Sequence, residues 1–212
     1  MTLVAYTKIG IDANIDAFWN KTESAFSSAE SRGYFDAIKA RKNQDSIKES
    51  LCALLVLAEL VKSPNVDLPT LILGRRESGK PCFINSKIEF SLSHSHGYAA
   101  AIISDESRVG IDLETAEISA EKAEKLAKRF FSAREICEFE ASPNNFLKLW
   151  TKKEAFAKMQ GIPLSVLLAI EKKSPENMRN DAYFCELSAD GHPLTVCLGK
   201  PCEITSLGEI NV

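Results

Sequence analysis

Two acidic residues alternate with apolar residues in the hexapeptide VGIDLE, at positions 109–114. This alternation is typical of a half-buried β-strand. In a strand Asp112 and Glu114 point the same way, because side chains two positions apart share a face. Each carboxylate raises the cost of ionising the other. The six residues therefore have two interpretations: unrelated acids on a solvated face, or a site for a hard divalent cation, which prefers carboxylate oxygens.

A second group of chemically active residues lies on a predicted helix with the sequence LWTKKEAFAK. Trp150, Glu154 and Lys158 are four positions apart and so form one stripe along the helix. An ordinary surface ion pair would explain Glu154 and Lys158. Trp150 at the head of the stripe, however, indicates that the stripe faces the interior, where a metal ion with a phosphate group would satisfy both charges.

The segment FSLSHSHG, at positions 90–97, contains a third group. Strand alternation places Ser91, Ser93 and Ser95 on one face and His94 on the apolar face. A histidine in such a position is more often structural than functional. A Ser–His nucleophile pair is an alternative, but no G-x-S-x-G motif surrounds it, which argues against hydrolase chemistry.

Several basic residues near predicted turns and helix starts could bind an anion, although most are expected to be simply solvated. Lys80 lies between Gly79 and Pro81 in a constrained turn and is the best positioned of them. The others are Arg41, Lys42, Lys48, Arg75 and Arg76.

The bulk composition limits the class of protein. The 212 residues are 45% hydrophobic and 26% charged, as expected for a globular protein with a core. A net charge of −3 gives no broad attraction to nucleic acid or to membranes. The sequence has neither a long apolar run nor a signal-peptide pattern. We therefore expect a cytoplasmic protein that binds neither nucleic acid nor membranes. The six scattered cysteines are expected to be reduced, and a zinc site is not indicated.

Helices and strands that must position these residues follow one another along the whole chain. Strands are predicted over residues 2–8, 69–74, 88–95, 98–105 and 108–114, the last three forming an antiparallel meander, with further strands at 182–188 and 193–199. Helices are predicted over residues 13–40, 43–62, 119–131, 132–141 and 144–161. Ser132 and Glu135 form a capping box, Asn144 or Asn145 is the N-cap of the last helix, and Gly161 follows its end.

Each half of the chain thus combines helices with antiparallel strands. We predict the α+β class, with an N-terminal subdomain over residues 1–105 and a C-terminal subdomain over residues 106–212 that carries the metal site.

Five segments taken in order resemble the 4′-phosphopantetheinyl transferases of the surfactin-synthetase-activating type. They are GKP, FSLSHS, VGIDLE, FFSAREICEF and FLKLWTKKEAFAKMQG, and they extend over about residues 79–165. The G-I-D-x-E and W-x-x-K-E-x-x-x-K motifs, in this order and spacing, are specific to the family. The resemblance implies a monomer of two similar α+β halves related by a pseudo-twofold axis, with coenzyme A between them. It also implies Mg²⁺-dependent transfer of phosphopantetheine from coenzyme A to a serine of an acyl or peptidyl carrier protein, releasing 3′,5′-ADP.

The resemblance also assigns roles to individual residues. The implied metal ligands are Asp112, Glu114 and Glu154, and the implied catalytic residues are Glu154, Lys158 and Asp112. The residues expected to bind coenzyme A are Arg41, Lys48, Lys80, Ser93, His94, Lys153 and Lys158, with Arg41 and Lys48 assigned to the 3′-phosphate. A serine hydroxyl is a weak nucleophile, so we expect Glu154 to act as its base, directly or through water. Lys158 would stabilise or protonate the leaving phosphate.

Two other functions are kept as alternatives: a non-catalytic module of the same fold that binds coenzyme A or a carrier protein, and a metal-dependent phosphohydrolase. The presence of all the acidic residues and of Lys158 favours the active transferase. The helix that follows the metal strand could dock an acidic carrier helix, although a solvated amphipathic helix explains it equally well. Its relevant residues are Ile118, Lys122, Lys125, Leu126, Lys128 and Arg129.

Overall fold

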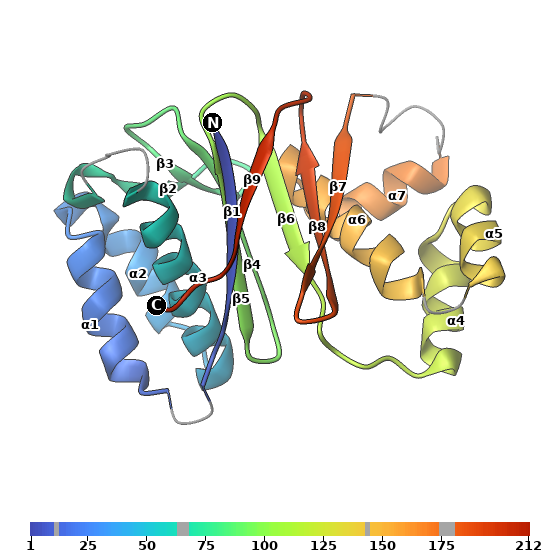
Figure 1. Cartoon of the computed structure of the whole chain (residues 1–212), viewed down its shortest axis with the longest axis horizontal. Helices are drawn as coiled ribbons and strands as arrows, with labels where there is room; N and C mark the ends of the chain where they lie inside the picture. The colour runs from blue at the N-terminus through green and yellow to red at the C-terminus, as the bar shows by residue number, and fades with distance from the viewer. Residues whose placement is uncertain (11–12, 63–67, 143–144, 174–180) are drawn as a thin grey trace.

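The computed structural model describes residues 1–10, 13–62, 68–142, 145–173 and 181–212, and within these ranges the chain forms seven α-helices and nine β-strands (Figure 1). The helices are α1 (Ile15–Ala25), α2 (Arg32–Lys39), α3 (Gln44–Lys62), α4 (Ala120–Phe130), α5 (Ala133–Ala141), α6 (Phe146–Gln160) and α7 (Leu164–Lys173). The strands are β1 (Thr2–Lys8), β2 (Leu73–Arg75), β3 (Pro81–Phe83), β4 (Glu89–Ser95), β5 (Tyr98–Ser104), β6 (Val109–Leu113), β7 (Tyr183–Ala189), β8 (His192–Leu198) and β9 (Ile204–Glu209).

The strands form two main sheets and a small ribbon. The first sheet has the order β4-β5-β1-β9, the second has the order β6-β8-β7, and β2 pairs with β3. All pairs are antiparallel except β1 with β9, so the C-terminal strand returns to the first sheet beside the N-terminal strand (Figure 1). This mixture of helices and largely antiparallel sheets confirms the predicted α+β class.

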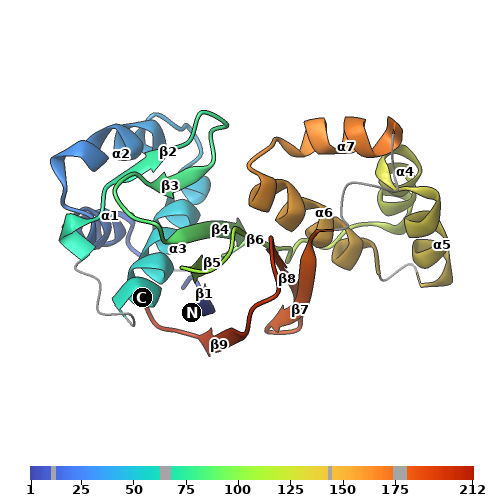
Figure 2. The same ribbon diagram turned by 90° about the horizontal axis from the view of Figure 1, so that it is seen from above.

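Each main sheet carries helices, and the two sheets share a core. Helices α1, α2 and α3 lie on the side of the first sheet, whereas α6 and α7 lie with the second (Figure 2). Strand β5 is buried on both faces: Ala99, Ala101 and Ile103 contact the helical core, while Ala100 and Ile102 contact the core shared with β6 and β8. Burial on both faces explains why this strand is almost uninterruptedly apolar.

The predicted meander of three strands is only partly correct. Strands β4 and β5 form the expected hairpin, but β6 pairs with β8 instead of continuing the same sheet. The free edge of β5 is already occupied by β1, so β6 has no edge there to join. Its apolar residues Val109, Ile111 and Leu113 are buried in the shared core.

Strands β4 and β6 nevertheless lie side by side, because β4 supplies a row of serines in place of a backbone ladder. The row is buried, and every second residue of β4 contacts every second residue of the β6 segment. The Oγ atoms of Ser91, Ser93 and Ser95 accept the backbone N–H groups of Ile111, Leu113 and Thr115 at 3.2, 3.1 and 3.2 Å. We call this contact the serine seam; it joins the two sheets at the residues singled out in the sequence.

Several other predictions are confirmed or corrected. The capping box of Ser132 and Glu135 is formed, and Gly161 ends α6 in the left-handed conformation with φ 71°. Asn145 takes the N-cap position of α6, and Asn144 lies outside the described residues. The predicted helical region 13–40 is two helices, because the chain turns at residues 26–28 and buries Phe26.

Towards the C-terminus and around residue 70, the secondary structure predicted from the sequence was wrong. The sequence indicated only strands after residue 163, and both α7 and the pairing strand β9 were missed. The strand predicted at 69–74 begins at Leu73, after a short 3₁₀ turn over Leu68–Thr70.

Candidate active site

Asp112 lies in the interior between β6, β4 and α6. Its side chain is 3% exposed, which excludes the solvated-face interpretation for this acid. Oδ1 accepts hydrogen bonds from Lys158 Nζ at 2.7 Å and from Ser93 Oγ at 2.9 Å. Oδ2 is buried and has no hydrogen-bond partner among the described residues. A buried carboxylate oxygen without a partner carries a large desolvation cost, so this atom indicates a missing cationic or donor group.

Gly110 explains how α6 comes so close to this strand. A Cβ atom at Gly110 would lie 1.9 Å from the carbonyl oxygen of Ala155 and 2.5 Å from the backbone nitrogen of Met159. Only glycine therefore allows α6 to lie directly on β6. The glycine of the G-I-D-x-E motif thus positions the charged stripe of α6 against Asp112.

The stripe of α6 is half-buried and faces β6, where Glu154 lies near the charge of Asp112. Trp150 Nε1 donates a hydrogen bond to Glu154 Oε1 at 2.9 Å. Burial, followed by the charge of Asp112, raises the pKa of Glu154 to about 7. Burial and Asp112 likewise raise the pKa of Glu114, although Ser95 Oγ donates to Glu114 Oε2 at 3.2 Å. The three carboxylates therefore influence one another electrostatically.

Ser93 stands at the centre of this group. Its hydroxyl donates to Asp112, and its oxygen accepts hydrogen bonds from the backbone N–H of Leu113 and from Lys158 Nζ, the latter at 2.9 Å. One donor and two acceptor sites are the full capacity of a serine hydroxyl. Ser93 therefore joins the strand, the carboxylate and the lysine.

The carboxylates around Asp112 have some of the features of a cation site. An unpartnered oxygen of Asp112, with Glu114 and Glu154 nearby, suits a hard cation that prefers oxygen ligands. Across the described ranges, however, no three Asp, Glu, His or Cys side chains are gathered closely enough to hold a metal ion. The geometry therefore does not assemble the predicted three-carboxylate site, and Lys158 occupies one oxygen of Asp112.

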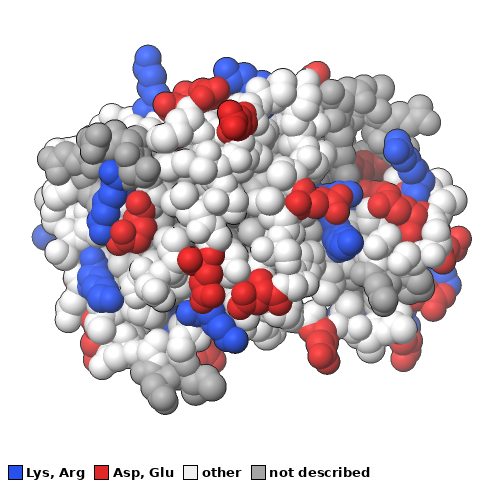
Figure 3. All heavy atoms as spheres, viewed as in Figure 1, with Lys and Arg blue, Asp and Glu red and all other residues white. Residues whose placement is uncertain are grey.

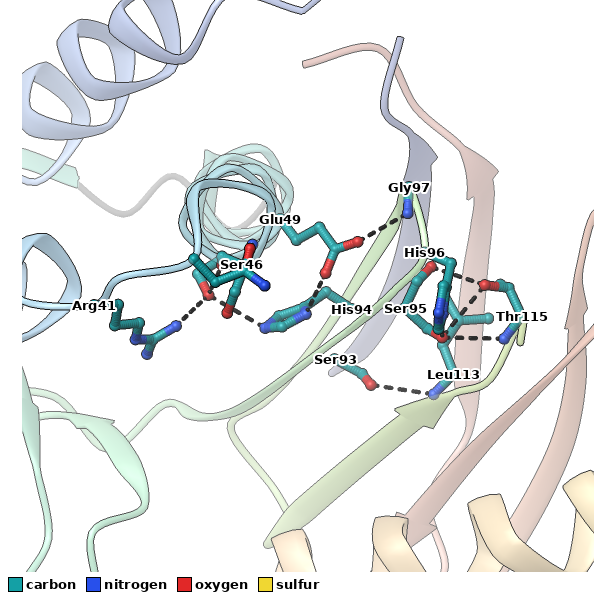
Figure 4. A network of polar contacts seen from close by, with 12 residues as sticks. Arg41, Ser46, Glu49, Ser93, His94, Ser95, His96, Gly97, Leu113 and Thr115 are labelled. Carbon is teal, nitrogen blue, oxygen red and sulfur yellow. Dashed lines mark hydrogen bonds and ion pairs between the residues drawn. The ribbon is translucent and has the colours of Figure 1, made fainter. Parts of the chain in front are cut away.

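His94 and three residues around it form a second polar network (Figure 4). His94 Nδ1 lies 2.9 Å from Glu49 Oε2, and Nε2 lies 3.2 Å from Ser50 Oγ. Arg41 Nη1 donates to the same Ser50 oxygen at 2.6 Å. The structure thus brings Arg41 and His94 together, although 53 positions separate them in the chain.

Glu49 and Ser50 were not singled out from the sequence. Both lie on α3, where Ser50 falls on the same face as the buried Ile47 and Leu54 and is only 8% exposed. A polar residue at a buried position of such a helix is the signal that could have indicated them.

Two cavities border the site. A cavity of about 650 Å³ is lined by Lys48, His94 and Glu114 among others. A second, of about 290 Å³, lies between the turn at Gly79 and the end of α6, and both Lys80 and Lys158 line it. Lys158 and Ser91 line the smaller cavity. Glu114 and Ser95 line the larger one.

Lys80 is more buried than a turn lysine is expected to be. Its Nζ donates to the carbonyl oxygens of Val109 at 2.9 Å and of Met159 at 3.3 Å, and its side chain is 7% exposed. Burial lowers the pKa of Lys80 to about 8. Lys80 therefore ties the turn to β6 and α6 at the edge of the smaller cavity.

Lys153 does not take part in this group, which runs against the expectation that it binds coenzyme A. Its side chain is fully buried and forms ion pairs with Glu135 at 2.8 Å and with Glu171 at 2.5 Å. Because consecutive residues of a helix point about 100° apart, Lys153 faces α5 and α7 while Glu154 faces β6. We therefore assign Lys153 to the packing of three helices.

The basic run on α4 is partly neutralised on its own helix. Lys125 pairs with Glu121 and Lys128 with Glu124, all four side chains being well exposed. Ile118 and Leu126 are partly buried against the core formed by α4, α5 and α6. This arrangement favours the solvated amphipathic helix over a carrier-docking surface.

The surface seen in Figure 3 carries acidic and basic side chains interspersed with neutral ones. On this face neither sign gathers into one large patch. Among the described helices, none is long and apolar enough to cross a membrane.

The sequence matches one family of known proteins, in the segment that contains much of this site. The profile of the 4′-phosphopantetheinyl transferase superfamily matches residues 108–200, which include β6 and α6. The 4′-phosphopantetheinyl transferase AcpT of Salmonella typhi is 32% identical over 176 residues, covering 80% of this chain and 86% of the relative. The transferase Sfp of Bacillus subtilis is 32% identical over 132 residues, or 59% of this chain and 57% of Sfp. HetI of Nostoc is 36% identical over 102 residues, covering 44% of this chain and 43% of HetI.

Proposed function

The chain belongs to the 4′-phosphopantetheinyl transferase superfamily, and we propose that it transfers the 4′-phosphopantetheine group of coenzyme A to a serine of an acyl or peptidyl carrier protein. The product beside the holo-carrier is 3′,5′-ADP. The observation that carries the proposal is the buried Asp112, held by Lys158 and Ser93 beside two further carboxylates, within the segment that matches the superfamily.

The reaction breaks the pyrophosphate linkage of coenzyme A and forms a phosphodiester with the carrier serine. The serine oxygen of the carrier forms a bond to the phosphorus next to pantetheine, and the bond from that phosphorus to the bridging oxygen of 3′,5′-ADP breaks. The serine loses a proton, and negative charge develops on the departing phosphate. Catalysis therefore requires a base for the serine and positive charge near the phosphates.

Glu154 is the proposed base. A pKa of about 7 leaves this group able to accept a proton near neutral pH, which an ordinary glutamate does poorly. The hydrogen bond from Trp150 Nε1 fixes one carboxylate oxygen and leaves the other for the serine or an intervening water.

Lys158 is the proposed phosphate-binding cation. It lies one helical turn beyond Glu154 on the same face of α6, and its side chain is 32% exposed, so it borders both the buried carboxylate and the smaller cavity. Lysine acts as a point charge towards a phosphate and can move from Asp112 to an incoming ligand without a fixed bidentate geometry.

The unpartnered oxygen of Asp112 supports a magnesium ion at this place. We propose that Asp112 and Glu114 hold it, with Glu154 kept for the proton. When bound, Mg²⁺ would neutralise charge on the phosphate oxygens and relieve the repulsion between these carboxylates.

Coenzyme A is proposed to lie across the serine seam, between the two cavities. Arg41, Lys48 and His94 are assigned to its 3′-phosphate. Lys48 and His94 line the larger cavity, and Arg41 shares a hydrogen bond to Ser50 with His94. Lys80 is assigned to the nucleotide end through the smaller cavity. Ser93 would act mainly by holding Lys158 and Asp112 in place through its hydrogen bonds.

The subtype of the family, the oligomeric state, the domain boundary and the cellular compartment are also proposals. Assignment to the surfactin-synthetase-activating type rests on the similarity to Sfp, which covers less of this chain than the similarity to AcpT does. We further propose a monomer divided near residue 105 that acts in the cytoplasm. No disulfide links the cysteines of the described ranges, as a reducing compartment favours.

The direct test is transfer of phosphopantetheine from coenzyme A to a panel of apo-carrier proteins of fatty acid, polyketide and peptide synthesis, followed by mass shift. We expect a gain of one phosphopantetheine group with Mg²⁺ and none with EDTA. Glu154→Gln and Asp112→Ala should each abolish most of the transfer. Full activity in both variants would overturn the assigned roles.

The same assay separates the alternatives. Tight binding of coenzyme A without release of 3′,5′-ADP with any carrier would indicate a non-catalytic binding module. Hydrolysis of coenzyme A in the absence of a carrier would indicate a phosphohydrolase.

A further inference from the structure

A carboxylate that none of the proposed roles uses lies at the centre of the network around His94. Glu49 on α3 accepts two hydrogen bonds: Oε2 from His94 Nδ1 at 2.9 Å, and Oε1 from the backbone N–H of Gly97 at 2.9 Å (Figure 4). Its side chain is 16% exposed. Glu49 therefore joins α3 both to the end of β4 and to the turn that follows it.

The turn held by Glu49 is conformationally restricted. His96 and Gly97 have φ values of 39° and 85°, as in the tight two-residue turns that connect antiparallel strands. Fixing the N–H of Gly97 fixes the end of β4, on which His94 stands. Both hydrogen bonds of Glu49 therefore control the direction in which the imidazole points.

The hydrogen bonds around the ring fix its orientation. A carboxylate only accepts, so Nδ1 of His94 carries a hydrogen that it donates to Glu49. On the other side of the ring, Nε2 lies 3.2 Å from Ser50 Oγ, which also accepts a hydrogen bond from Arg41. The imidazole is therefore held at both of its nitrogens.

The surroundings lower the pKa of His94 overall. Burial is the largest cause, and the positive charges of Lys158 on α6 and of Arg41 before α3 act in the same direction. Glu49 opposes them through its charge and its hydrogen bond. Removing that one carboxylate should therefore lower the pKa of His94 further.

We propose that Glu49 is a positioning residue that holds His94 beside Arg41 and Ser50 through its hydrogen bonds to Nδ1 and to the turn, so that these three side chains form a corner for the 3′-phosphate of coenzyme A. Glu49 itself does not touch the phosphate; it acts through His94. The identity of the anion rests on the proposed function, whereas the pairing of Glu49 with His94 does not.

The pairing is tested without any ligand, by following the histidine ring nitrogens in ¹⁵N-labelled protein by NMR as the pH is changed. The chain has three histidines, and a His94→Asn variant assigns the signal. We expect Glu49→Gln to lower the pKa of His94 by about one unit or more. The matched control is Glu59→Gln, an exposed acid on the same helix that pairs with Lys62. An unchanged titration in Glu49→Gln would overturn the proposal.

The phosphate corner is tested by comparing coenzyme A with 3′-dephospho-coenzyme A, which lacks only the 3′-phosphate. Glu49→Gln should weaken binding of coenzyme A about tenfold, because the imidazole is then no longer held at the phosphate. Binding of the dephospho compound, and kcat at saturating substrate, should stay near wild type. A merely structural defect would weaken both compounds alike and would contradict the assignment.

A double-mutant cycle shows whether Glu49 acts through His94. In a His94→Ala background, Glu49→Gln should cause no further loss of preference for coenzyme A over its dephospho form. An additional independent loss would overturn the positioning role. Failure of the wild-type protein to bind coenzyme A would overturn the proposed function and the phosphate corner, while the NMR titration would still decide the Glu49–His94 pairing.

Discussion

Lys158 Nζ lies 2.7 Å from Asp112 Oδ1, so that a cation of α6 meets a buried carboxylate of β6 beneath a serine of β4. This contact joins a helix and a strand of the second sheet to a strand of the first. The same two residues border the space proposed for the phosphates. Removal of either charge should therefore affect catalysis more than binding of the carrier.

Replacement of Lys158 tests the phosphate-binding role. We expect Lys158→Ala to lower kcat about 100-fold, because an aligned cation stabilises charge that develops as the phosphate departs. Lys158→Arg should recover only part of the loss, since the guanidinium is larger and planar. Kinetics of holo-carrier formation measure both, and Lys152→Ala on the same helix, which removes the ion-pair partner of Glu186, serves as the control. Wild-type turnover in Lys158→Ala would exclude the role.

The pH dependence of turnover tests Glu154 as the base. Its pKa is raised by burial and by Asp112 to about 7, so its carboxylate form is lost as the pH falls through that value. We expect kcat to fall on the acid side, approaching about tenfold per pH unit. The Glu154→Gln variant should have a low, flat profile in the same range. A wild-type profile without an acid limb near neutral pH would contradict the assignment.

The same raised pKa predicts a stability effect of defined sign. Between the ordinary glutamate pKa of 4.5 and about 7 the folded state binds a proton that the unfolded state does not, so the free energy of unfolding should decrease as the pH rises through this window. In EDTA at pH 8, Glu154→Gln should therefore have a higher Tm than wild type, and at pH 4 the difference should vanish.

Glu124 provides a control of opposite sign. Its pKa is lowered by the hydrogen bond from Lys128, so its ion pair stabilises the fold only above the unfolded value. Glu124→Gln should lower the Tm slightly at pH 8. Calorimetry of the variants at both pH values makes the comparison, and the same sign in both variants would refute it.

Lys153 should matter for stability and not for coenzyme A. Its ammonium group is fully buried between Glu135 and Glu171, and Lys153→Met would remove the cation shared by these two carboxylates. We expect a loss of about 3–5 kcal/mol in the free energy of unfolding, measured by urea denaturation. The KM for coenzyme A of the remaining folded protein should be unchanged. A raised KM with intact stability would restore the original coenzyme A assignment.

Gly110→Ala should separate α6 from β6. The added Cβ would collide with backbone atoms of Ala155 and Met159, which cannot move aside as a flexible side chain can. We expect a loss of about 3 kcal/mol in urea denaturation together with a severe loss of turnover. Gly33→Ala on α2 is the control, because nothing lies within 4 Å of its Cβ position. That control should be neutral or stabilising by about 0.5–1 kcal/mol.

Local pattern in the sequence determined most of the helices and strands. The spacing of apolar residues in α3, the capping box of Ser132 and the glycine at 161 all act within a few residues, so they could be read without the rest of the chain. The same holds for the inward stripe of Trp150, Glu154 and Lys158, where Trp150 indicated the buried face. The order and spacing of short motifs indicated the family.

Only the tertiary structure decided which surfaces meet. Whether β6 continues the first sheet or begins the second depends on β1 occupying the edge of β5, a contact between distant parts of the chain. Lys153 and Glu154 are neighbours in sequence, yet one packs against α5 and α7 and the other against β6. The contacts of Glu49 and Ser50 with His94 were decided by the fold, which places α3 against β4. Local periodicity says which residues share a face, but the partner of that face is chosen by packing across the whole chain.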